Sequence, residues 1–152
     1  MTTDDLQTYC LDLMQAARQW RRLADAVVRP HGLSEATALP LILIARRAGI
    51  RQTALAEAMG VEGPSLVRLL DQLCAAGLVT REPDQADRRA KCLHLTQRGR
   101  GLASRIVKDL DVLRRDVFAD VSQNDLETSR RVFAQLASIP GPSEASVEEA
   151  AS

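Results

Sequence analysis

Two short amphipathic segments with a glycine between them constrain this fold most. Residues 52–59 and 64–76 each have helical apolar spacing, and the stretch Gly60-Val61-Glu62-Gly63 separates them. Gly60 permits the positive φ of a tight turn, and Gly77 suits the position just after the second helix. Pro64 suits the first turn of that helix. The spacing therefore predicts a helix–turn–helix.

The apolar residues of this segment fit the same interpretation. Ala56 is small enough to let the two helices approach closely. The remaining apolar positions would hold the helices at a fixed angle, and they are Leu55, Met59, Val61, Leu66 and Leu69. On the second helix, a rotation of 100° per residue places Ser65, Arg68 and Gln72 together on the side opposite the leucines.

Two short strands are expected next. The segments LVTRE (78–82) and KCLHLT (91–96) flank the polar tip PDQADRRA. Before the helix–turn–helix, Ser34 can cap a helix with Leu33 as its staple residue, although Pro40 should kink that helix. Three helices followed by a two-stranded wing predict a winged helix-turn-helix lobe at 33–96.

Long helices are expected at both ends. Apolar residues recur with helical spacing from Leu6 to Val27, and the breaker Pro30-His31-Gly32 follows. Thr96 can cap a long helix, and Ser122 can open a last one. The stripe of the long helix is Leu102, Ile106, Leu110, Leu113, Val117 and Val121. The predicted fold class is mainly α with a small β-wing: the winged lobe, a helical dimerisation region (1–30 and 97–139) and a disordered acidic tail (140–152).

Composition excludes several classes of protein. The 152 residues are 45% apolar, no apolar run approaches the roughly 20 residues of a membrane span, and the start lacks a signal-peptide pattern. Three cysteines, at positions 10, 74 and 92, make neither a disulfide framework nor a zinc knuckle. A globular cytoplasmic protein is therefore expected.

The charge of the chain is unevenly distributed. Its net charge is zero, but residues 46–108 carry twelve basic and six acidic residues, a net +6. A basic middle between acidic ends is typical of a chain that meets a polyanion with one part only.

These features predict contacts to double-stranded DNA. Near a helix N-terminus, residues of the types of Ser65, Arg68 and Gln72 reach base edges and phosphates in a major groove. An arginine on a hairpin tip can enter a minor groove. Asp87 could fix its direction by accepting a hydrogen bond either from a neighbouring arginine side chain or from backbone amides of the tip. The predicted DNA-binding residues are Pro64, Ser65, Arg68, Gln72, Arg88, Arg89 and Lys91.

The stretch GVEGPSLVRLLDQLCAAGLVTRE and the wing DRRAKCLHLT, with Thr96 and Gly99 in an LTxxG motif, resemble the MarR family of winged-helix transcription regulators, closest to its SlyA-like branch. The resemblance implies a homodimeric bacterial repressor on a pseudo-palindromic operator. It implies that Ser65 and Arg68 read the major groove, that Arg88 or Arg89 enters the minor groove, and that Asp71 pairs with Arg81 to brace the wing. Pro40 and Cys92 depart from the family pattern.

The resemblance also implies an effector, a small aromatic carboxylate bound between the first, second and long helices. The candidates for its cation, flat ring and hydrogen-bond donor are Arg18, Trp20 and His31, in that order, although each also suits a structural role.

A thiol-based redox sensor that uses Cys10 is an alternative function. However, Cys10 lies on an apolar stripe, where a thiol serves as a small hydrophobe. Cys74 is expected in the core. A winged-helix module for protein contacts is a second alternative. No enzyme motif, metal cluster or cofactor motif is present in the sequence.

Overall fold

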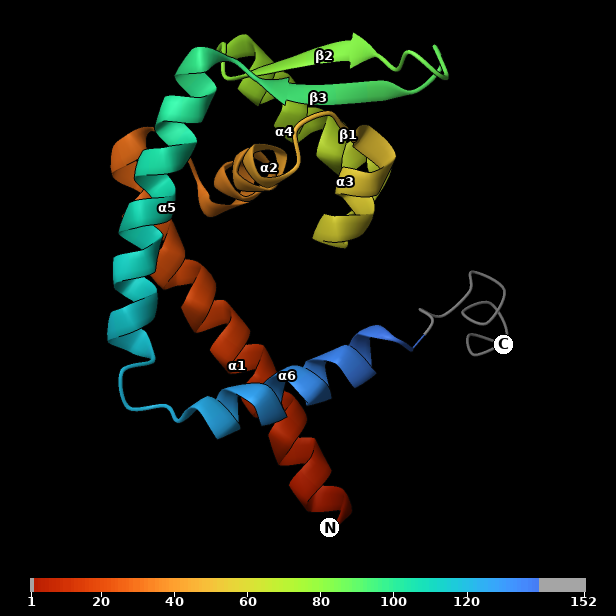
Figure 1. Cartoon of the computed structure of the whole chain (residues 1–152). Coiled ribbons are helices and arrows are strands. Elements are labelled where there is room, and N and C mark those ends of the chain that lie inside the picture. The colour runs from red at the N-terminus through yellow and green to blue at the C-terminus, as the bar shows by residue number, and fades with distance from the viewer. Residues whose placement is uncertain (1, 140–152) are drawn as a thin grey trace. The chain divides into compact units, whose positions relative to one another are not determined.

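The computed structural model describes residues 2–139 (Figure 1). Its elements in chain order are α1 (Thr3–Val28), the 3-10 turn η1 (Arg29–His31), α2 (Glu35–Arg46), β1 (Ile50–Arg51), α3 (Gln52–Met59), α4 (Gly63–Ala75), β2 (Val79–Pro83), β3 (Lys91–Leu95), α5 (Gln97–Val117) and α6 (Gln123–Ala137). The fold class is as predicted: mainly helical with a small antiparallel sheet. The expected tail at 140–152 lies outside the described residues.

The helices begin where polar side chains can accept their first free amides. Ser34 accepts from the Thr37 amide at 3.3 Å, and Ser122 accepts from the Asp125 amide at 3.1 Å. Thr96 accepts from the Gly99 amide at 3.0 Å at the start of α5. All three predicted helix starts, at Ser34, Thr96 and Ser122, are confirmed.

Glycines end both helices of the helix–turn–helix. Gly60 has φ +63° after α3, and Gly77 has φ +67° after α4, so both adopt the left-handed conformation that glycine favours. At the end of α4 the amide of Leu78 donates to the Leu73 carbonyl, and the amide of Gly77 donates to the Cys74 carbonyl. This pair of bonds is a Schellman motif, and it turns the chain from α4 directly into β2.

The sheet has three strands rather than the predicted two. Strand β3 lies in the centre, antiparallel to β2 on one side and to β1 on the other. β1 was missed because two residues, Ile50 and Arg51, are too short to show an alternating pattern. We define the wing as β2, β3 and the loop 84–90 between them. Strand β1 places Arg51, the residue before α3, beside β3 of this wing.

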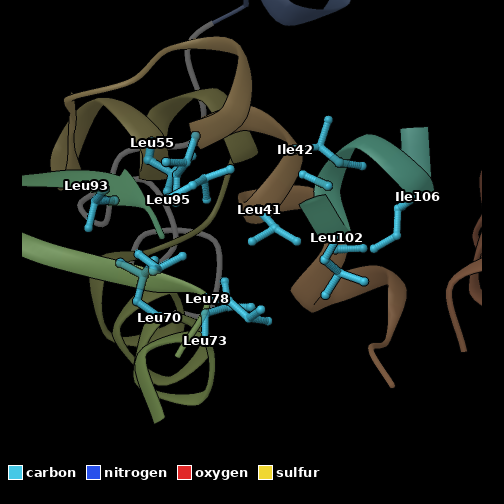
Figure 2. Packing of buried hydrophobic residues seen from close by; sticks show 14 of the residues in the cluster. Leu41, Ile42, Leu55, Leu70, Leu73, Leu78, Leu93, Leu95, Leu102 and Ile106 are labelled. Carbon is cyan, nitrogen blue, oxygen red and sulfur yellow. The ribbon is translucent and has the colours of Figure 1, made fainter. Parts of the chain in front are cut away.

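Buried leucines and isoleucines from α2, α3, α4, the sheet and α5 form one core (Figure 2). Leu41, Leu55 and Leu93 are fully buried at its centre. Helix α2 runs through Pro40 without interruption, so the proline does not end the helix, and the expected kink stays a prediction. Pro40 is itself buried, so packing of this apolar helix outweighs the hydrogen bond that proline cannot donate.

The described chain divides into two compact units, one up to Arg115 and one from Asp116. In the second unit α6 has no buried residue, and Phe133 and Leu136 are about half exposed. The predicted stripe of the long helix is too long by one residue, since α5 ends at Val117 and Val121 lies beyond it. None of the helices between residues 2 and 139 combines the length and apolar content that a bilayer crossing needs.

Candidate nucleic-acid interface and ligand groove

Helix α4 presents a polar face to solvent. Leu66, Leu70 and Leu73 are buried on its inner side. The predicted contact residues Pro64, Ser65, Arg68 and Gln72 are all exposed on it. Pro64 lies in the first turn of α4, where the free amides and the positive end of the helix dipole favour an anion.

The wing tip carries exposed cations on an ordered loop. Arg88, Arg89 and Lys91 are exposed. The Asp87 carboxylate accepts a hydrogen bond from the backbone amide of Arg89 at 3.0 Å, and the Asp87 carbonyl accepts from the Ala90 amide at 2.9 Å. Asp87 therefore shapes the backbone of the tip. Of the two partners considered for Asp87, a side chain or a tip amide, the structure has the amide.

A groove of about 340 Å³ lies between the helix–turn–helix and the wing. Arg51, Arg89 and Lys91 supply three cations along it, and Gln52 and Thr53 form the first turn of α3 beside them. α3 has no acidic residue in its own first turn, so no carboxylate of α3 itself offsets the positive end of its dipole. This arrangement suits a polyanion that contacts the first turn of α3 and the wing tip together.

An ion pair connects α4 to the wing. Arg81 Nη1 lies 2.6 Å from Asp71 Oδ1, and its Nη2 donates to the Val67 carbonyl at 3.3 Å. Arg81 is register partner to the buried Leu93, so its side chain lies on the core face of the sheet, toward α4. The Asp71–Arg81 pair expected from the resemblance is present, and it ties the contact helix to β2.

A second groove, of about 120 Å³, lies within the first unit between α1, α2 and α5. One face of α2 lines its whole length, from Glu35 to Arg46, a rise of about 16 Å at 1.5 Å per residue. Trp20 lies on its α1 side, and Leu110 and Arg114 lie on its α5 side. The groove thus offers a flat ring, an aliphatic floor and two cations.

Only one of the three predicted effector residues lines this groove. Trp20 does, whereas Arg18 is exposed on α1 outside it. His31 is also outside it: its Nε2 lies 2.7 Å from Asp109 Oδ2, and this pair joins η1 to α5. Arg46 and Arg114 were not predicted as effector residues. The basic ends of α2 and α5 were the only available signal, and sequence spacing alone cannot show that these two helix ends meet.

The cysteines do not form a metal or disulfide site in the described chain, which also holds no cluster of potential metal ligands. Cys10 is exposed rather than buried, as are most residues of the N-terminal half of α1, and Cys74 is half-buried. Burial first, and then the charge of Asp84, raises the pKa of the Cys92 thiol. A raised pKa disfavours the reactive thiolate, so Cys92 is a poor redox centre.

The helix–turn–helix, the wing that follows it and the cationic groove between them define a winged helix-turn-helix protein. A MarR-family sequence model matches residues 31–90. The solved structure of transcriptional regulator PA3341 is 36% identical, with a TM-score of 0.77 over 84% of this chain and 94% of that one. The chain belongs to the MarR family and is a transcriptional regulator.

Two more distant structures share the fold. MarR of Staphylococcus aureus, solved in complex with salicylate and kanamycin, is 23% identical, with a TM-score of 0.75 over 88% of this chain and 91% of that one. The regulator SlyA is 17% identical, with a TM-score of 0.76 over 84% of this chain and 90% of that one. Identities this low show the fold alone, so the SlyA-like branch stays a prediction.

Proposed function

We propose that this chain is a cytoplasmic bacterial repressor that binds a pseudo-palindromic DNA operator as a homodimer and leaves it when a small aromatic carboxylate binds. The observation that carries the proposal is the exposed polar face of α4 together with the cationic groove that separates the helix–turn–helix from the wing. A major groove about 12 Å wide admits α4, and a flanking minor groove would then meet the wing tip.

The proposed roles differ between the helix and the wing. Ser65, Arg68 and Gln72 would contact base edges or phosphates, with Arg68 making a bidentate contact to a guanine. Arg88 and Arg89 would enter the minor groove, where width and A·T content decide the attraction. Pro64 and Lys91 would contact the backbone, which positions the protein without reading sequence.

Operator selection with Arg68→Ala tests this division. The variant should bind about 5- to 150-fold more weakly, equivalent to about 1–3 kcal/mol, and should lose the preference at one base position. Arg89→Ala is the matched control: it should weaken binding more evenly and alter only the preference for A·T-rich flanks. Identical base preferences for the wild type and Arg68→Ala would remove Arg68 from the reading role.

The homodimer is supported by apolar residues that this chain leaves exposed in each unit separately. On α1 these are Leu6, Tyr9, Leu11 and Met14, and from Asp116 onward they include Phe133 and Leu136. We assign the dimerisation role to the regions 1–30 and 97–139. A dimer interface over these regions would cover these exposed apolar side chains, and obligate dimer interfaces commonly bury more than about 2,000 Å².

The effector proposal uses the groove along α2. Trp20 would pack against the ring of an aromatic acid, and Arg46 or Arg114 would pair with its carboxylate. Arg114 is already held by Asp111 at 2.5 Å, which leaves Arg46 as the first candidate. Salicylate in the Staphylococcus aureus relative supports an acid of this class. The acid can weaken operator binding only through its different affinity for the free and DNA-bound arrangements.

A titration of aromatic acids against the protein–operator complex tests the effector. Salicylate-like acids should weaken operator binding about 5- to 150-fold, and the operator should weaken the acid by the same factor. Arg46→Ala should remove most of this effect and leave binding without the acid nearly intact. Arg18 is a cation in the same compact unit but outside the groove, so Arg18→Ala should respond like the wild type. Release that depends on Arg18 but not on Arg46 would contradict the groove assignment.

A further inference from the structure

An ion pair joins the start of the helix–turn–helix to the wing loop. Arg51 Nε lies 2.6 Å from Asp84 Oδ2, across 33 positions of sequence. The Asp84 side chain is only 13% exposed, whereas that of Arg51 is 49% exposed. Arg51 precedes α3 directly, and Asp84 is the first residue of the loop that carries Arg88 and Arg89.

The other oxygen of the same carboxylate organises the loop. Asp84 Oδ1 accepts from the amide of Ala86 at 2.7 Å and from the amide of Asp87 at 3.4 Å. The backbone amide of Asp84 donates to the Ala90 carbonyl at 3.0 Å and closes the loop at its base. One carboxylate therefore holds the helix–turn–helix with one oxygen and the wing tip with the other.

Arg51 occupies a position that normally goes to a residue of another type. It is the N-cap of α3, where serine, threonine, aspartate or asparagine would accept a hydrogen bond from the first turn. Arginine cannot accept one, and α3 has no side-chain cap. At this position the chain thus has the Asp84 contact in place of a side-chain cap.

We propose that Asp84 is a positioning residue for DNA binding, which acts through Arg51 to hold the wing-tip arginines at a fixed distance from α4. The inference rests on the proposed DNA-binding function and deepens it. A protein that reads a major groove and the adjacent minor groove together loses affinity when one of its two contact elements must be ordered on binding. Asp84 removes that cost by ordering the loop beforehand.

The direction in which one substitution changes the DNA affinity distinguishes this positioning role from a purely electrostatic effect. Asp84→Asn removes a negative charge beside a cationic, DNA-facing groove, so charge alone predicts tighter DNA binding. If Asp84 positions the wing, the variant binds about tenfold more weakly, because an amide cannot form the ion pair with Arg51. Glu82→Gln is the matched control: Glu82 is an exposed acid on β2, and its loss should leave binding equal or tighter.

A double-mutant cycle tests whether Arg51 and Asp84 act together. Arg51→Gln combined with Asp84→Asn should be no weaker than Arg51→Gln alone, whereas additive effects would mean that the two residues act independently. Arg51→Lys keeps the charge balance and removes the guanidinium, so it should also weaken binding. In each positioning variant the preference for A·T-rich flanks should flatten, while the base preference read by Arg68 is retained. A general loss of folding would not give that pattern.

The measurement is the operator affinity of each variant by fluorescence anisotropy, with thermal melting to show that the variant is folded. Asp84→Asn that binds as well as or better than the folded wild type overturns the positioning role. A wild type that binds no duplex overturns the proposed DNA-binding function instead, so the two failures are distinguishable. If Asp84→Asn melts below the assay temperature, Arg51→Lys decides the question by the same flank readout.

Discussion

At the residue scale, Asp84 links the wing to the acid stability of the fold. The hydrogen bond from the Ala86 amide, followed by that from Arg51, lowers the pKa of the Asp84 carboxyl from its usual value of 3.8. A carboxyl with a lowered folded-state pKa stabilises the folded state above its unfolded pKa and loses this contribution as pH falls through the folded value. The difference in unfolding free energy between the wild type and Asp84→Asn should therefore be largest near neutral pH and shrink below about pH 4. Urea unfolding at several pH values measures it, and a difference that grows toward low pH would contradict the assignment.

Structural roles could be predicted from the sequence where a residue type strongly favours one backbone position. Gly60 and Gly77 were predicted to end helices because a positive φ leaves few alternatives, and Thr96 was predicted as a cap for a comparable reason. The Arg51–Asp84 pair could not be predicted this way. Arginine and aspartate are ordinary surface residues, and only the three-stranded register of the folded sheet brings these two together.

At the element scale, the junction between α4 and α5 depends on a close approach of two backbones. A Cβ on Gly99 would lie 2.1 Å from the Leu78 carbonyl oxygen, while one on Gly101 would have only the far end of Arg105 near it, at 3.9 Å. Gly99→Ala should destabilise the fold by about 1–3 kcal/mol, because backbone must move. Gly101→Ala, two residues along the same helix, should instead stabilise it by about 0.5–1 kcal/mol. Chemical denaturation of the pair measures this contrast, and equal effects would show that the approach at Gly99 is not tight.

Residues of the core and residues of the proposed dimer interface differ in burial along the helices α5 and α6. Leu113 packs against the core of the first unit, whereas Phe133 on α6 is 48% exposed. Leu113→Asp should therefore give aggregated or unfolded protein, and Phe133→Asp should give a folded first unit that no longer dimerises. Sedimentation equilibrium with circular dichroism checks both variants. A soluble, folded Leu113→Asp monomer would contradict this reading of α5.

At the scale of the whole molecule, topology was easier to predict than pairing between elements. The order of four helices, a wing and two further helices follows from the helix-ending residues Gly60 and Gly77 and from the polar wing tip, and the described chain has this order. The groove beside Trp20 could not be predicted from the sequence. It forms where α1, α2 and α5 meet, and no single segment of the sequence determines the spacing between these three helices. For that reason Arg18 was favoured as the effector cation over Arg46, which lines the groove.

The central claim is that this winged helix-turn-helix protein binds a specific duplex. Its most direct test is the affinity of the wild-type protein for the DNA upstream of its own gene, compared with a scrambled duplex, across a series of salt concentrations. The account predicts specific binding by a dimer to half-sites about one helical turn apart. It also predicts that log affinity falls linearly with log salt, by about 0.9 for each phosphate that lysine or arginine neutralises. Equal affinity for both duplexes, or affinity that does not change with salt, would contradict it.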